Sequence, residues 1–122
     1  MKEDKPFSIS ARWRSFVFAF RGLLDFFKKE HNAWIHLFIS IIVIILGFIM
    51  HISAGEWIAI CFAIGFVWVT ELINTAIEKI MDFISPAEDP RIKLIKDISA
   101  GAVLVAAIVA VIIGTIVFIP KF

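Results

Sequence analysis

The sequence predicts an all-α membrane protein with an N-terminal amphipathic helix at the membrane interface and three transmembrane helices. Of the 122 residues, 61% are hydrophobic, and the mean hydropathy is +0.95. A folded chain of this size buries only about 60–70% of its surface, so it has too little interior to hide these side chains from water. Two long stretches carry no charge, and a third begins apolar and ends acidic. We expect residues 1–122 to form one domain.

Composition also excludes two other classes of protein. The single cysteine excludes a disulfide framework and a cysteine zinc site. The net charge of +1 argues against a nucleic-acid binder, which carries a large basic excess.

The first expected element is an amphipathic helix over residues 10–29. Charged and aromatic side chains recur there with a helical period, which is typical of a helix lying in the membrane interface. The charged stripe is Arg14, Arg21, Asp25 and Lys28, and the opposite stripe is Phe16, Phe20, Leu23 and Phe27. The residues before it are too polar and too few for a signal peptide, so the first span is expected to remain in the mature protein.

Two of the three expected spans are free of charged residues. They cover residues 33–50 and 98–119, and each is long enough to cross a hydrocarbon core of about 30 Å. The small residues at the start of the second of these, around Gly101 and Ala106, provide a surface on which helices can pack closely.

The middle span, residues 57–80, carries an acidic stripe. Four side chains fall on one face of the helix wall: Glu71, Asn74, Glu78 and Asp82. Asp82 alone is interpreted as a solvated residue at a helix end. Glu71 lies about 21 Å along a helix that starts at Trp57, which places it inside the hydrocarbon. A carboxylate there costs about 2.5–3.5 kcal/mol to insert, so it indicates a functional site.

The distribution of lysine and arginine predicts the orientation. The His51–Glu56 turn has none, whereas basic residues precede the first span and recur between Lys79 and Lys96. Because basic loops stay in the cytoplasm, we expect the N-terminus and the loop of residues 85–97 inside and the C-terminus outside. The basic residues before the first span are Lys2, Lys5, Arg12, Arg14, Arg21, Lys28 and Lys29.

Glu71 and Glu78 lie seven residues apart on one face of the helix, with the amide of Asn74 between them. This arrangement suits divalent-metal coordination or proton transfer. Glu30, at the entrance to the first span, is expected at a similar depth. Lys96 and Asp97 open the last span and offer a cation for phosphate and a further anion. The three histidines lack metal-ligand spacing and are interpreted as structural: His31, His36 and His51.

The same residues leave other functions open. An oligomeric ion or proton channel could use Glu71, Asn74 and Glu78 to line a pore, although a pore does not require Lys96. An accessory subunit of a larger complex would leave the acidic face without a role. The chain has no GxxxxGK loop, so any nucleotide site would be unusual.

Two motifs carry a resemblance to a known family. ELINTAIEKIMD (Glu71 to Asp82) and KDISAGAVL (Lys96 to Leu104), together with Glu30, resemble the prokaryotic diacylglycerol kinase family of membrane lipid kinases. The HIS turn, Ser85-Pro86, Pro90 and the VFIPK ending resemble its undecaprenol kinase branch more than its enteric branch.

The resemblance implies a homotrimer in the bacterial inner membrane with active sites shared between protomers. Each site would transfer the γ-phosphoryl group of ATP to a lipid alcohol at the cytoplasmic interface. Undecaprenol, giving undecaprenyl phosphate, is the expected acceptor, and diacylglycerol, giving phosphatidate, is the alternative.

Residue roles are also implied by the resemblance alone. Glu71 corresponds to the general base and Asn74 to its polar neighbour, whereas Glu30 and Glu78 correspond to the ligands of Mg²⁺. Lys96 and Asp97 correspond to the nucleotide-contacting pair.

The chain departs from the family pattern in two places. An N-terminal arginine of the family falls at Ala11, beside Arg12, so no N-terminal substrate contact is assigned. Ala87 and Asp89 stand where the enteric branch has a glutamate and a histidine near the nucleotide.

Overall fold

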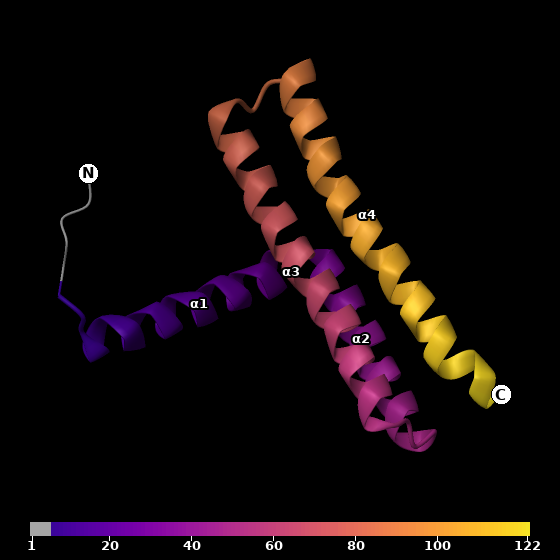
Figure 1. Ribbon diagram of the computed structural model, residues 1–122. Coiled ribbons are helices and arrows are strands. Elements are labelled where there is room, and N and C mark those ends of the chain that lie inside the picture. Colours follow the sequence, from indigo (N-terminus) through magenta and orange to yellow (C-terminus); the bar gives the residue numbers. More distant parts are fainter. Residues whose placement is uncertain (1–5) are drawn as a thin grey trace. The chain divides into compact units, whose positions relative to one another are not determined.

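The computed structural model describes residues 6–122, which contain four α-helices and one short 3-10 helix (Figure 1). Lys2 and Lys5, two of the basic residues that predict the orientation, lie outside the described residues. The chain divides into two compact units, one ending at Ile35 and one from His36 to Phe122.

Helix α1, Ile9–Lys29, confirms the predicted amphipathic helix. Its first turn is capped by Ser8, whose hydroxyl accepts a hydrogen bond from the Ala11 amide at 3.3 Å. The helix ends where Glu30 takes an extended conformation. Beyond this end, the indole of Trp34 donates to the Phe27 carbonyl at 2.8 Å, which satisfies one of the last carbonyls of α1. Of the apolar stripe of α1, Phe16, Phe20 and Leu23 are exposed and Phe27 is partly buried, which suits a helix whose apolar side faces lipid.

A short turn joins α2, His31–Ile49, to α3, Ala54–Ile84. His51 has a left-handed backbone (φ 50°), and the amides of Ile52 and His51 donate to the carbonyls of Gly47 and Phe48. This is the Schellman arrangement that ends helices. Ser53 and Glu56 then form a reciprocal capping box that starts α3.

Helix α4, Pro90–Phe118, corrects the predicted loop of residues 85–97. The helix begins eight residues before the expected span, because Asp89 caps it and Pro90 occupies its first turn. Hydropathy did not reveal these first two turns, since they are charged. After α4 the chain ends in the short helix η1, Ile119–Lys121.

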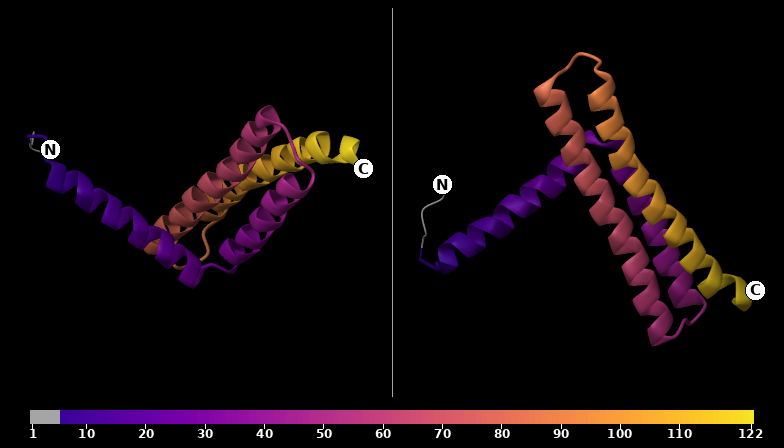
Figure 2. Two further views of the ribbon diagram at one scale, coloured as in Figure 1. Left: turned by 90° about the horizontal axis from the view of Figure 1, so that it is seen from below. Right: turned by 45° about the horizontal axis from the view of Figure 1, so that its top comes forward.

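The three long helices confirm three candidate spans. At 1.5 Å per residue, the 19 residues of α2 extend about 28 Å, whereas the 31 of α3 and 29 of α4 extend more than 40 Å. Helices α3 and α4 run antiparallel and side by side (Figures 1 and 2). Both are longer than a hydrocarbon core, so part of each extends beyond it.

The apolar core lies at the α2–α3 turn. It consists of Ile52, Ile60, Val117 and Phe118, with Trp57 packed against it. Most other large apolar side chains of the spans are exposed, which suits a chain surrounded by lipid or by further protein.

Candidate active site

The acidic stripe of α3 is buried at one end and open at the other. Glu71 is 4% exposed and Asn74 is 9% exposed, whereas Glu78 is half-buried and Asp82 is exposed. The stripe thus runs from the interior of the helix group toward the α3–α4 loop. The structure brings Glu71, Asn74 and Glu78 onto one face, as their spacing predicts.

A chain of hydrogen bonds links this stripe to α4. Ser99, itself buried, donates to the Asn74 amide oxygen at 2.7 Å, and the Asn74 amide nitrogen donates to Glu78 Oε1 at 3.2 Å. An ionised carboxylate only accepts, so Glu78 requires the nitrogen side of the amide, and the amide oxygen then requires the Ser99 proton. Ser99 therefore fixes the orientation of Asn74. Sequence reasoning missed Ser99, which belongs to the KDISAG motif.

Lys96 and Asp97 point to different partners. Lys96 Nζ lies 2.5 Å from Asp82 Oδ1, across the gap between α4 and α3. Asp97 pairs with Lys93 at 2.6 Å on the same helix. The structure thus places Lys96 beside the acidic stripe and Asp97 on the exposed side of α4.

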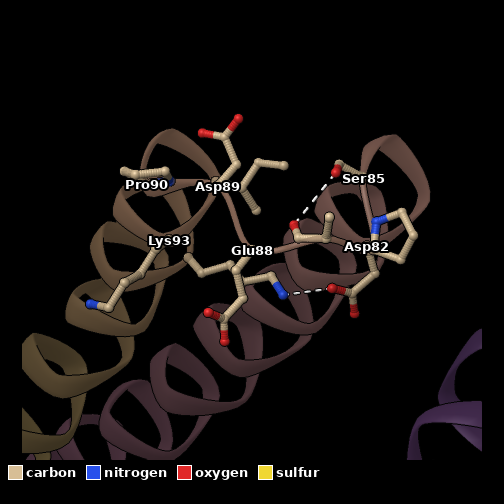
Figure 3. Close-up of a pocket in the computed structure, with 10 residues that line it drawn as sticks. Asp82, Ser85, Glu88, Asp89, Pro90 and Lys93 are labelled. Atoms are coloured by element: carbon tan, nitrogen blue, oxygen red, sulfur yellow. Dashed lines mark hydrogen bonds and ion pairs between the residues drawn. The ribbon is translucent and has the colours of Figure 1, made fainter.

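A cavity of 590 Å³ lies under the α3–α4 loop, at the open end of the stripe (Figure 3). Its charged rim combines acids and lysines from both helices and the loop: Asp82, Glu88, Asp89, Lys93 and Lys96. The guanidinium of Arg91 binds both carboxylate oxygens of Asp89 and holds the pKa of that carboxyl below its usual range. This end of the molecule therefore offers a hollow lined by charges of both signs.

His36 is the largest addition that the structure makes to the predicted site. Its Nε2 lies 3.7 Å from Glu71 Oε2. A signal for His36 is present in the sequence, because a titratable residue inside an apolar span indicates function whether or not it has metal-ligand spacing.

Glu30 lies in the N-terminal unit, at the C-cap of α1. Its position beside Glu78 stays a prediction. Within residues 6–122, no group of three or more histidine, cysteine or acidic side chains stands ready to hold a metal ion. A site built on Glu78 would therefore need further oxygen ligands from elsewhere.

Comparison with known proteins identifies the family. A profile described as prokaryotic diacylglycerol kinase matches residues 17–118. The chain belongs to the prokaryotic diacylglycerol kinase family. It is a multi-pass membrane lipid kinase, and ATP is the phosphate donor that a kinase requires. The family assignment therefore supports the lipid kinase over the ion or proton channel as the function of this chain.

The names of two similar proteins state an activity. The chain is 40% identical to the undecaprenol kinase of Bacillus subtilis (strain 168) over 119 residues, which cover 98% of this chain and 97% of that protein. It is 35% identical over 107 residues to the diacylglycerol kinase of Synechocystis sp. (strain ATCC 27184 / PCC 6803 / Kazusa), covering 87% of this chain and 61% of that protein.

Proposed function

We propose that this lipid kinase transfers the γ-phosphoryl group of ATP to undecaprenol and forms undecaprenyl phosphate. The 40% sequence identity to an undecaprenol kinase, over nearly the whole of both chains, supports this acceptor. The observation that carries the proposed chemistry is the burial of Glu71, which is 4% exposed within a candidate membrane span. A base at that depth suits an acceptor hydroxyl that belongs to a lipid.

In the proposed reaction Glu71 removes the proton from the lipid hydroxyl. The lipid oxygen forms a bond to the γ-phosphorus, and the bond from that phosphorus to the bridging oxygen of ADP breaks. Asn74, fixed by Ser99, holds the adjacent carboxylate of Glu78 in place. The protein's main contribution is to position the reactants and stabilise charge.

Glu78 and Glu30 are the residues proposed to hold Mg²⁺. Glu78 fits this role because its carboxylate is half-buried and offers the oxygen ligands that Mg²⁺ prefers. Mg²⁺ commonly uses one or two carboxylates and completes its shell with substrate phosphates and water, so two glutamates suffice. When bound, the ion would neutralise charge on the phosphates.

Lys96 and Asp97 are proposed to contact the nucleotide. Lys96 lies on the rim of the 590 Å³ cavity and pairs with Asp82. We propose that it exchanges this carboxylate for a phosphate of ATP. Asp97 reaches the nucleotide after it releases Lys93.

The assembly is proposed to be a homotrimer with shared active sites. Much of the surface of α2, α3 and α4 is apolar and exposed, and a Cβ at Gly101 would meet nothing within 4 Å. A neighbouring protomer can pack there and complete the shared site. All of residues 1–122 act as one domain in this proposal, in the bacterial inner membrane with the N-terminus cytoplasmic and the C-terminus outside.

Diacylglycerol is the second candidate acceptor, favoured by the similarity to the Synechocystis diacylglycerol kinase. The same residues can serve either lipid, because the reacting group in both is a hydroxyl. Discrimination between tails by apolar contacts is worth only about 1–3 kcal/mol for each methylene.

The test is phosphate transfer from γ-labelled ATP with Mg²⁺, catalysed by purified protein in mixed micelles that contain either undecaprenol or diacylglycerol. We expect preferential labelling of undecaprenol. Preferential labelling of diacylglycerol would instead support diacylglycerol as the acceptor. If folded protein labelled neither lipid, both proposed acceptors would be contradicted.

A further inference from the structure

His36 on α2 contacts Glu71, the proposed base, on the neighbouring helix α3. Its Nε2 lies 3.7 Å from Glu71 Oε2, and the two side chains are 22% and 5% exposed. Both residues lie within candidate membrane spans. At this depth water screens little charge, so a contact between imidazole and carboxylate is stronger than at a protein surface.

Further contacts surround His36 within α2 and between α2 and α3. Trp68 Nε1 donates to Ser40 Oγ at 3.1 Å, and Ser40 Oγ donates to the His36 carbonyl at 2.7 Å. The rings of His36 and Trp68 meet edge to face, with centroids 6.3 Å apart. Trp68 precedes Glu71 by one helical turn, and Ser40 follows His36 by one turn. These contacts set the register of α2 against α3 where the imidazole meets the carboxylate.

The distance between the two groups decides the nature of the contact. At 3.7 Å the contact is longer than a hydrogen bond, so it is an electrostatic contact between the imidazole edge and the carboxylate. A glutamate has three side-chain torsions, and burial alone does not select one carboxylate orientation. A polar ring anchored on a neighbouring helix restricts those torsions further.

We propose that His36 is a positioning residue for Glu71. It restrains the carboxylate so that the lipid hydroxyl meets a base already in place, and it acts through Glu71 without touching either substrate. The inference rests on the proposed role of Glu71 as the base. A displacement of a reacting group by about 1 Å can cost about 10²-fold in rate.

The test compares His36→Gln with His36→Leu in the full-length protein. Gln places an amide N–H close to the position of Nε2, whereas Leu retains bulk and removes the polar group. We expect His36→Leu to lower kcat about 10- to 100-fold with little change in the KM for ATP, and His36→Gln to recover most of the loss. His51→Asn serves as a control, because His51 lies at the α2–α3 turn and Asn tolerates its left-handed backbone.

A second comparison separates positioning from general stability. In a Glu71→Asp background the carboxylate is drawn back by one methylene, so His36→Leu should cost far less there than in the wild type. Equal losses in the two backgrounds, or equal losses for His36→Gln and His36→Leu, would overturn the positioning role. If His36→Leu is fully active while Glu71→Gln is inactive, the inference fails and the proposed base stands. If Glu71→Gln is fully active, the proposed base itself fails.

Discussion

The contacts of the α3–α4 pair change character along its length. Toward the α2–α3 turn, Ile60 on α3 and Val117 on α4 share one apolar core, and Lys121 after α4 pairs with Glu56 at the start of α3. Toward the α3–α4 loop, Ser99 binds Asn74 and Lys96 binds Asp82. Burial of apolar side chains dominates at the end near the α2–α3 turn, whereas directed polar contacts dominate at the end near the α3–α4 loop. Substitutions at the two ends should therefore separate stability from phosphate transfer.

Among the residues around the proposed base, Glu78 should have the largest effect on transfer. Glu78→Gln removes a charge that we assign to Mg²⁺, so transfer should fall about 10²-fold or more, the range typical for loss of a charge-stabilising group. Phosphate transfer measured against Mg²⁺ concentration checks this. Glu88→Gln, on the rim of the cavity, is the matched control. An unchanged Mg²⁺ dependence of Glu78→Gln would remove Glu78 from the metal site.

The apolar end should respond most to Gly47→Ala. A Cβ at Gly47 would lie 2.6 Å from the Trp57 ring, which packs against the core, so the ring or the helix must shift. Overpacking of this kind costs about 1–3 kcal/mol. Thermal unfolding should show the loss, whereas Gly65→Ala, where a Cβ meets nothing within 4 Å, should not. Equal Tm values for both variants would show that Trp57 does not restrict Gly47.

Ser99→Ala should lower both the stability of the fold and the rate of transfer. It removes the donor to the buried Asn74 oxygen, which costs about 1–3 kcal/mol, and it frees the amide that contacts Glu78. Transfer and Tm should be compared with those of Thr115→Ala, whose exposed hydroxyl bonds its own helix. Identical behaviour of the two variants would contradict an orienting role for Ser99.

The smallest expected effect concerns the cap of α4 at low pH. The Asp89 pKa is lowered in the folded protein, so its ion pair with Arg91 stabilises the fold at neutral pH. That contribution is lost as pH falls through the folded pKa. Asp89→Asn keeps a capping side chain but not the charge, so its Tm should be lower than wild type at pH 7 and equal at the acidic limit. A constant difference at all pH values would contradict this.

The sequence predicted the helices well because charge and hydropathy mark where a chain can enter a bilayer. The bounds of α1 and α2 lie within two residues of those predicted. The start of α4 was missed because its first turns are charged, although Asp89-Pro90 is a typical helix start. Capping signals decide where helices begin outside the membrane.

The candidate site was predictable only within one helix. Helical periodicity placed Glu71, Asn74 and Glu78 on one face, but contacts between helices depend on register, which no spacing in the sequence reveals. The contacts of His36 with Glu71 and of Ser99 with Asn74 were therefore missed. The pairing of Lys96 with Asp82 was missed for the same reason.

The α3–α4 pair thus has an apolar end that we assign to stability and a polar end that we assign to catalysis. The most direct test of this assignment is phosphate transfer by Glu71→Gln in bilayers, measured together with its thermal unfolding. The substitution keeps size and polarity and removes the base, so we expect a wild-type Tm and a loss of transfer of about 10²- to 10⁴-fold. A folded Glu71→Gln protein that phosphorylates lipid at the wild-type rate would contradict the assignment of catalysis to the polar end.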